Sequence, residues 1–311
     1  MKLFLGVDGG QSSTTALVGD ESGRVIGIGR GGPCNHATGA AGREKFVKAI
    51  GGCVREALAG NEAAFEAACF GLSGGSEDKE TLAREIVKAE SYVFTHDGLI
   101  ALVGATAGEP GVIAIAGTGS FAFGRNAAGR VARAGGWGYI FGDEGSAFDI
   151  VRQALRASLR FEEGWGPRTA LRDALLESTG ARDANDLLHR FYTDEFPRSR
   201  AASLAEIVDA VALAGDPIAR DLLNGAGQSL AMFASAVRAQ LFASGEIARV
   251  SYIGGVFRSA MVLDRFRALM ELEEANRVAA PKFGPAAGAL MEAYRAAGLA
   301  AKLQNAPPEK F

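Results

Sequence analysis

The N-terminal part of the chain begins with three short apolar runs and continues with an amphipathic stretch. The runs KLFLGVD, TTALVGD and RVIGIGRG are separated by turns that contain Gly and Ser, which is typical of consecutive strands. Apolar residues then recur at helical spacing over 42–59, from Phe46 to Leu58. The chain is therefore predicted to open with three strands and a helix.

Strand and helix patterns alternate through the rest of the chain, which predicts an α/β protein. Residues 144–243 have mainly helical spacing, and 156–245 contain no motif that we can assign to a ligand. The other expected elements are a buried strand in EAACFGLSGG, a helix over 78–89, a strand in YVFT, a helix over 98–107, strands in GVIAIAG and RVSYIGGVF, a helix over 258–272, a short strand in NRVAAP and a helix over 285–298.

Two segments share one plan and suggest an internal repeat. GVDGGQSSTTALVGDESGRVIG and IAGTGSFAFGRNAAGRVARAGG each read as strand, Gly-rich tip, strand, a turn that ends in Gly-Arg, and strand. The plainer alternative is that Gly-rich hairpins are common in a chain with 42 glycines. The repeat predicts two similar halves that face one another across a cleft, which is a favoured place for a ligand.

The tips of both hairpins have the composition of an anion-binding loop. Glycines allow a tight turn and a close approach to oxygen-rich ligands, and several N–H groups can then converge on one anion. Neither tip is a Walker P-loop or a dinucleotide-binding turn, because no Gly-Lys-Ser/Thr follows and both lead into strands. The candidate phosphate contacts are Gly9, Gly10, Ser12, Ser13, Thr14 and Thr15 in the first tip, and Gly117, Thr118, Gly119 and Ser120 in the second.

Charge and composition exclude several classes of partner. The 311 residues include 33 Lys and Arg and 36 Asp and Glu, without a basic run, which argues against nucleic acid or an anionic membrane surface. No apolar stretch approaches the ~20 residues that a transmembrane helix needs. Cys34, Cys53 and Cys69 show neither metal-type spacing nor a disulfide framework, so a reducing cytoplasm fits best.

One carboxylate, Asp97 in SYVFTHDGLIALVGAT, lies where a strand pattern gives way to a helical one. An aspartate at that point can cap the helix by accepting hydrogen bonds from its first free N–H groups. It can also serve as a general base toward a substrate hydroxyl. The local pattern alone leaves both interpretations open.

Five motifs together resemble a known family. GVDGGQSSTT, GLSGG, THDG, IAGTGS and GGWGYIFGDEGSAFDI, in this order, are similar to the N-acetylglucosamine kinase branch of the BadF/BadG/BcrA/BcrD ATPase family, within the actin/hexokinase/heat-shock-chaperone ATPase superfamily. The resemblance implies two ribonuclease-H-like domains, over 1–116 and 117–311, with ATP and a sugar in the cleft. Helical insertions are expected in the second domain, and helix 285–298 either stays with it or packs back on the first. Members of the family are often dimers, so a homodimer is also implied.

The resemblance also assigns roles to individual residues. Asp97 falls on the position of the catalytic base, and Asp8 on that of a ligand for Mg²⁺. The positions implied for ATP and its phosphates are Gly9, Gly10, Gln11, Ser12, Thr14, Gly117, Thr118, Gly119, Ser120, Gly254 and Gly255. Those implied for the sugar are Asn35, Ser73, Gly74, Asp97, Thr118, Trp137 and Asp143.

Several of these residues have plainer interpretations. Asp8 could be a solvated strand end, Trp137 could belong to the core, and Asn35 could be a turn residue. Asp143 and Glu144 precede a helical pattern and could cap it. The charged residues over 168–200 are interpreted as a solvated helical face, and the three histidines as structural or exposed.

Three classes of function follow from these observations. The first is an ATP-dependent kinase acting on the 6-hydroxyl of N-acetylglucosamine, with glucosamine and N-acetylmuramic acid as alternative substrates. The second is an ATPase that activates a dehydratase, which needs cysteine thiolates at an exposed iron–sulfur site. The third is a sugar-sensing regulator without turnover. Scattered cysteines argue against the second class, and no DNA-binding segment is expected before MKLFLGVD for the third.

Overall fold

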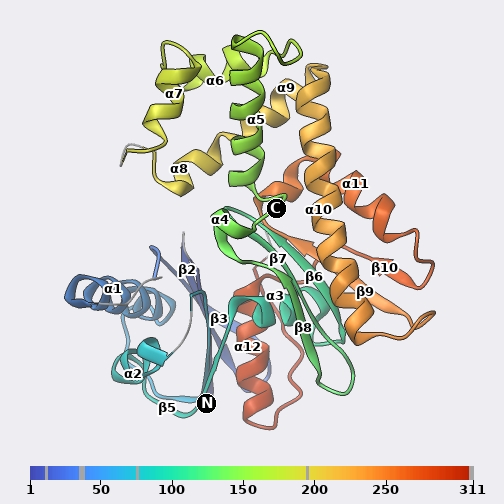
Figure 1. Ribbon diagram of the computed structural model, residues 1–311. Coiled ribbons are helices and arrows are strands. Elements are labelled where there is room, and N and C mark those ends of the chain that lie inside the picture. Colours follow the sequence, from blue (N-terminus) through green and yellow to red (C-terminus); the bar gives the residue numbers. More distant parts are fainter. Residues whose placement is uncertain (11–12, 35–38, 75–76, 194–195, 308–311) are drawn as a thin grey trace. The chain divides into compact units, whose positions relative to one another are not determined.

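In the computed structural model, which describes residues 1–10, 13–34, 39–74, 77–193 and 196–307, the chain forms two α/β units (Figure 1). One unit comprises Met1–Gly111 together with Ala280–Lys310, and the other comprises Val112–Ala279. The chain thus leaves the first unit once and returns to it, so the C-terminal helix is part of the same unit as the N-terminal strands.

The first unit is a five-stranded sheet in the order β3-β2-β1-β4-β5 with helices on both faces. Its first three strands form an antiparallel meander, and β1, β4 and β5 run parallel. Its elements are β1 (Leu3–Gly9), β2 (Thr14–Asp20), β3 (Val25–Gly31), α1 (Gly39–Ala57), β4 (Phe65–Leu72), α2 (Glu77–Ile86), β5 (Ala89–Thr95), α3 (Asp97–Thr106) and α12 (Pro285–Ala296).

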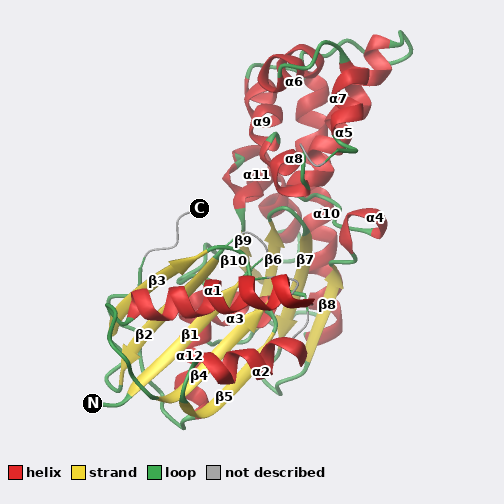
Figure 2. Cartoon of the chain, turned by 90° about the vertical axis from the view of Figure 1, so that its left-hand side faces the viewer, coloured by secondary structure: helices red, strands yellow, loops and turns green. Residues whose placement is uncertain are grey.

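Successive apolar side chains along each strand point to opposite faces of this sheet, which explains why helices cover both faces. Leu5 and Val7 point into a core that includes Phe46 and Ile50 of α1, and Figure 2 shows α1 and α2 lying over the sheet. Phe4, which immediately precedes Leu5 and therefore points to the other face, belongs to the opposite core with residues of α3 and α12. A sheet buried on both faces needs such continuous apolar runs, as the sequence of β1 and β4 shows.

Helix α12 is held closely against the first strand. A Cβ atom at Gly6 would lie 2.1 Å from the backbone nitrogen of Leu290, so the helix could not approach β1 over any larger residue. Further along α12, the buried Tyr294 hydroxyl donates to the Asp20 carbonyl over 2.8 Å. These contacts join the last helix to the sheet that begins the chain.

The second unit has a sheet in the order β10-β9-β6-β7-β8 and a large set of helices. β6 pairs with β9 and β9 with β10 in parallel, while β7 and β8 form an antiparallel hairpin. Its elements are β6 (Gly111–Ala116), β7 (Ser120–Arg125), β8 (Val131–Gly135), α4 (Gly138–Phe141), α5 (Ala147–Glu162), α6 (Leu171–Thr179), α7 (Ala184–Arg190), α8 (Arg198–Ser203), α9 (Ala205–Leu213), α10 (Pro217–Leu241), β9 (Ala248–Ile253), a 3-10 turn (Gly255–Arg258), α11 (Ala260–Met270) and β10 (Asn276–Val278).

One continuous core joins the sheet of the second unit to its helices. Val112 and Ala114 of β6 pack in the same cluster as Val151 of α5 and Leu230 of α10. The long helix α10 begins after Asp216, whose carboxylate accepts a hydrogen bond from the third residue along, Ala219, at 2.9 Å. Within the described residues, no helix is both long and apolar enough to cross a membrane.

Candidate active site

Three of the expected site residues of the first unit lie at the carboxyl-terminal edge of its parallel strands. Asp8 pairs in register with Gly71 of β4, and Gly71 pairs with Thr95 of β5. Ser73 lies one residue beyond the end of β4, and Asp97 lies two residues beyond the end of the adjacent β5. The Ser73 N–H donates to the Gly9 carbonyl over 3.0 Å. This edge is where ligands bind in open α/β sheets.

His96, and not Asp97, is the N-cap residue of α3. The His96 Nδ1 atom accepts from the Leu99 N–H at 3.2 Å, and its backbone is extended as a cap requires. Asp97 is the first residue of the helix and is half-buried. In the described part of the chain, its carboxylate accepts a single hydrogen bond, from the Gly98 N–H to Oδ1 at 2.9 Å. His96 therefore provides the side-chain cap of α3, and the catalytic interpretation of Asp97 stays a prediction.

The Ser73–Gly74 turn presents a hydroxyl that has no partner among the described residues. Ser73 is 6% exposed, and its Oγ is fully buried without a hydrogen bond. Gly74 follows with φ 75°, a left-handed conformation that favours glycine. A buried hydroxyl without a partner is costly, so a bound ligand is the natural acceptor or donor for it.

The first glycine-rich tip packs closely against the segment after β3. Any Cβ at Gly9 would lie 2.6 Å from the Cys34 Sγ, so glycine is required there. The Gly10 N–H donates to the Ser13 carbonyl at 2.9 Å and closes the tip. Thr14 is buried, and its hydroxyl donates to the Gly32 carbonyl at 2.8 Å. Three expected site residues, Gln11, Ser12 and Asn35, lie outside the described residues.

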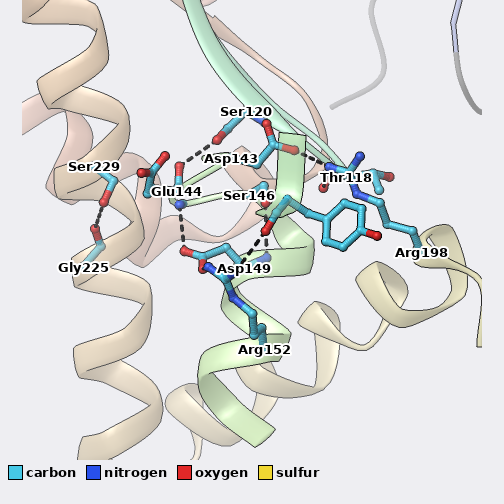
Figure 3. Close-up of polar contacts among 12 residues, drawn as sticks. Thr118, Ser120, Asp143, Glu144, Ser146, Asp149, Arg152, Arg198, Gly225 and Ser229 are labelled. Atoms are coloured by element: carbon cyan, nitrogen blue, oxygen red, sulfur yellow. Dashed lines mark hydrogen bonds and ion pairs between the residues drawn. The ribbon is translucent and has the colours of Figure 1, made fainter. Parts of the chain in front are cut away.

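The second tip is joined to the segment that precedes α5. The Gly117 N–H donates to the Gly119 carbonyl at 2.9 Å, and the Gly117 carbonyl accepts from the Ala147 N–H at 2.9 Å. Figure 3 shows the next contact, in which the Ser120 hydroxyl donates to the Glu144 carbonyl over 2.7 Å. The GGWGYIFGDEGSAFDI block is therefore fixed to the glycine-rich tip by its backbone.

Asp143 is buried at the centre of this arrangement, with 4% of its surface exposed. Its φ of 64° is left-handed, which aspartate tolerates better than most residues. The Ser120 N–H approaches Asp143 Oδ1 at 3.5 Å. The interpretation that Asp143 or Glu144 caps α5 is wrong, because Ser146 is the N-cap residue and its hydroxyl accepts from the Asp149 N–H.

Arg198, the first residue of α8, completes the cluster and was missed in the sequence. Its Nη2 forms an ion pair with Asp143 Oδ2 and donates to the Thr118 carbonyl at 3.2 Å (Figure 3). The interpretation of 168–200 as a solvated face is thus wrong for this residue. No local signal could reveal the pairing, since 55 positions separate the two partners.

Trp137 is not a core residue. Its side chain is 77% exposed, and the Arg133 guanidinium carbon lies 6.0 Å from the centre of its ring. An exposed aromatic face is suited to the apolar face of a sugar ring.

Gly254 and Gly255 follow β9, next to the end of β6. Gly254 has φ 112°, and a Cβ there would lie 2.2 Å from the Ala116 carbonyl oxygen. Because β6 and β9 are parallel, these glycines and the Gly117 tip share one edge of the sheet. Gly255 is exposed and has open space around its Cα.

The cysteines are buried and free in this structure. Cys34, Cys53 and Cys69 are each 0% exposed, and burial raises the pKa of all three thiols, that of Cys53 to about 12. Neutral, inaccessible thiols are poor ligands for an iron–sulfur cluster. Among the described residues, no group of three or more His, Cys, Asp or Glu side chains could hold a metal ion.

The comparisons with known proteins agree on one family. The BadF/BadG/BcrA/BcrD ATPase family matches residues 5–293 of the chain. An N-acetylmuramic acid/N-acetylglucosamine kinase of Clostridium acetobutylicum is 31% identical over 281 residues, which are 88% of this chain and 91% of that protein. An N-acetyl-D-glucosamine kinase of Dictyostelium discoideum is 29% identical over 246 residues, 74% of this chain and 77% of that one.

The solved structures agree with the fold. The crystal structure of a candidate N-acetylglucosamine kinase from Chromobacterium violaceum matches with a TM-score of 0.77 and 25% identity, over 94% of this chain and 98% of that one. The expected fold class, two ribonuclease-H-like units of the actin-like ATPase kind, is confirmed.

Proposed function

Because the chain belongs to the BadF/BadG/BcrA/BcrD ATPase family, we propose that it is an ATP-dependent amino-sugar kinase that phosphorylates the 6-hydroxyl of N-acetylglucosamine. Its relatives in Clostridium acetobutylicum and Dictyostelium discoideum, named as kinases of N-acetylated amino sugars, support this substrate class. Glucosamine and N-acetylmuramic acid are the alternative acceptors.

The observation that carries the proposal is that His96, and not Asp97, caps α3. His96 caps α3, and the Asp97 carboxylate at the ligand edge of the sheet accepts one hydrogen bond among the described residues, from the adjacent Gly98 N–H. Phosphoryl transfer needs the acceptor hydroxyl oriented in line with the γ-phosphate, and a carboxylate within about 3 Å that accepts its proton. In the proposed reaction, Asp97 would take that role.

The phosphate side of the proposal rests on the two glycine-rich tips. Their N–H groups would bind the phosphates of ATP, and Gly254 and Gly255 would border its adenosine. Asp8 would hold Mg²⁺. A single carboxylate fits this ion, since Mg²⁺ is usually bound by one or two carboxylates together with substrate phosphates and water. The ion would neutralise charge on the transferred group.

The sugar side would combine residues with hydroxyl, carboxylate and aromatic groups. Ser73 offers a buried hydroxyl that has no partner in the described part of the chain, Asp143 a buried carboxylate and Trp137 an exposed ring. Gly74 and Thr118 would contribute through the turns in which they lie. Asn35 remains a candidate sugar contact by its position in the sequence.

A coupled assay of ADP release tests the proposal. The purified protein is given ATP, Mg²⁺ and, in separate reactions, N-acetylglucosamine, glucosamine or N-acetylmuramic acid, and NMR of the product locates the phosphate. Asp97→Asn should keep sugar binding and lose at least a hundredfold in kcat. Absence of ADP release with every hexosamine would refute the kinase assignment, and near-normal turnover by Asp97→Asn would refute the base.

A further inference from the structure

Lys79, on the second helix of the first unit, is buried next to the proposed acceptor site. The residue is 3% exposed, and its Nζ donates to the Ser73 carbonyl over 2.5 Å. Lysine is almost never fully buried unless its charge is paired. The burial of Lys79 therefore has to be explained by the groups with which its ammonium interacts.

The surroundings of Lys79 are polar and belong to the candidate site. A Cβ built on Gly74 would lie 3.8 Å from Nζ, so the ammonium lies against the Ser73–Gly74 turn. Burial lowers the pKa of Lys79, and the neighbouring Cys34 and Asp97 oppose this shift. The ammonium is thus within electrostatic range of the proposed base.

The turn that Lys79 holds is the one that carries the hydroxyl without a partner. Ser73 uses its carbonyl for the ammonium and its N–H for the Gly9 carbonyl, at 2.5 Å and 3.0 Å. With both backbone groups fixed, the direction of its Cα–Cβ bond is also fixed. Its Oγ stays buried and, among the described residues, without a hydrogen bond.

We propose that Lys79 is a positioning residue of the acceptor site, whose ammonium fixes the Ser73 backbone so that the Ser73 hydroxyl and the Asp97 carboxylate engage the same sugar. This inference rests on the proposed function and adds to it a residue that contacts no reacting atom. A methionine would fill a similar volume without the desolvation cost of a buried charge. We infer that the ammonium group serves to donate the hydrogen bond to the Ser73 carbonyl and to attract the Asp97 carboxylate.

Steady-state kinetics of Lys79→Met, with Lys79→Arg and the exposed Lys88→Met as comparisons, test the inference. For Lys79→Met we expect a rise of at least tenfold in KM for the sugar, with KM for ATP within twofold of the wild type. Lys79→Arg keeps a cationic donor and should recover most of the loss. Lys88→Met should behave as wild type, because Lys88 is exposed between α2 and β5.

A double-mutant cycle with Ser73→Ala shows whether Lys79 acts through Ser73. If it does, adding Lys79→Met to Ser73→Ala raises the sugar KM by less than threefold, so the two effects are far from additive. The inference is overturned if Lys79→Met leaves the sugar KM unchanged or raises the KM values for sugar and ATP equally. It is also overturned if the effects of Lys79→Met and Ser73→Ala on the sugar KM are fully additive. These outcomes leave the proposed function intact. If Lys79→Met does not fold, Lys79→Leu, which likewise cannot donate to the Ser73 carbonyl, takes its place in the cycle. A wild type without hexosamine turnover overturns the proposed function and this inference with it.

Discussion

Arg198 forms an ion pair with Asp143 close to the Cα atom of Gly119, in the glycine-rich tip between β6 and β7. A Cβ at Gly119 would lie 2.9 Å from Asp143 Oδ2 and 3.0 Å from Arg198 Nη2. The same guanidinium donates to the Thr118 carbonyl, so one side chain of α8 connects a proposed phosphate loop to a proposed sugar ligand. Glycine at position 119 is thus needed for the close approach of the ion pair.

Replacement of Arg198 by methionine should impair activity with the sugar more than it impairs folding. The change leaves the buried Asp143 carboxylate without its cation and releases the Thr118 carbonyl, and the loss of hydrogen bonds to a charged group costs about 1.5–3 kcal/mol. We expect a loss of about tenfold to a hundredfold in kcat/KM for the sugar, measured by ADP release.

The control for Arg198 is Arg182, whose side chain is 84% exposed and which lies 3.7 Å from Asp186. Exposed ion pairs contribute little, so Arg182→Met should change neither kcat/KM nor the unfolding midpoint appreciably. Equal kinetics in Arg198→Met and Arg182→Met would show that the Arg198–Asp143 pair has no role in the site.

Alanine at Gly119 should displace the ion pair. The new methyl group would overlap both the carboxylate and the guanidinium, so one of them has to move. We expect at least a tenfold loss of kcat/KM, measured by ADP release. Gly225→Ala is the matched control, because Gly225 lies in α10 with no atom near its added Cβ, and this change should stabilise the protein by roughly 0.5–1 kcal/mol. An active Gly119→Ala would argue that the pair is easily rearranged.

Much of the fold was predictable because each element has a local signature. The strands β1 and β2 coincide with KLFLGVD and TTALVGD almost residue for residue, since apolar runs bounded by glycine permit little else. The start of α5 was less predictable: DEGS contains several possible caps, and Ser146 takes the role. Local sequence identifies that a cap exists, while the tertiary environment decides which residue provides it.

The candidate site was predictable only where it consists of motifs. Asp97 could be singled out because it lies where a strand pattern gives way to a helical one, and Ser73 because the GLSGG motif resembles that of the family. Arg198 and Lys79 could not, since each gains its role by a contact with a distant segment or a turn, and both occur in ordinary charged helical sequence. A side-chain contact between segments that are distant along the chain cannot be recognised from a single sequence.

The capping and catalytic roles at the start of α3 should separate cleanly by mutation. His96→Ala removes the side-chain acceptor for the Leu99 N–H and should cost about 0.5–2 kcal/mol of stability, while kcat falls by less than fivefold. Asp97→Asn should give the reverse, with an unfolding midpoint close to wild type and at least a hundredfold lower kcat. Denaturant unfolding and ADP release, measured on both variants, check this. A large loss of stability in Asp97→Asn would assign the cap to Asp97 instead.

The three thiols should resist modification in the native protein. Each side chain is buried and each thiol pKa is raised by burial, so the reactive thiolate is scarce at neutral pH. We expect a maleimide reagent to label none of them within minutes, and to label all three after denaturation, as counted by mass spectrometry. Rapid native labelling, or iron in an anaerobic preparation, would favour the dehydratase-activating alternative.

Lys79→Met should stabilise the protein in a manner that depends on pH. Burial lowers the pKa of Lys79 from its ordinary 10.5, so the folded protein binds this proton less tightly than the unfolded chain does. The resulting cost to stability is fully present below the folded-state pKa and disappears as the pH rises past 10.5. The variant should therefore have a higher unfolding midpoint than wild type near neutral pH, and the difference should shrink as the pH approaches about 11. Thermal unfolding across this range checks the sign. A variant that is less stable at neutral pH would mean that the hydrogen bond to Ser73 and the attraction to Asp97 outweigh the desolvation of the charge.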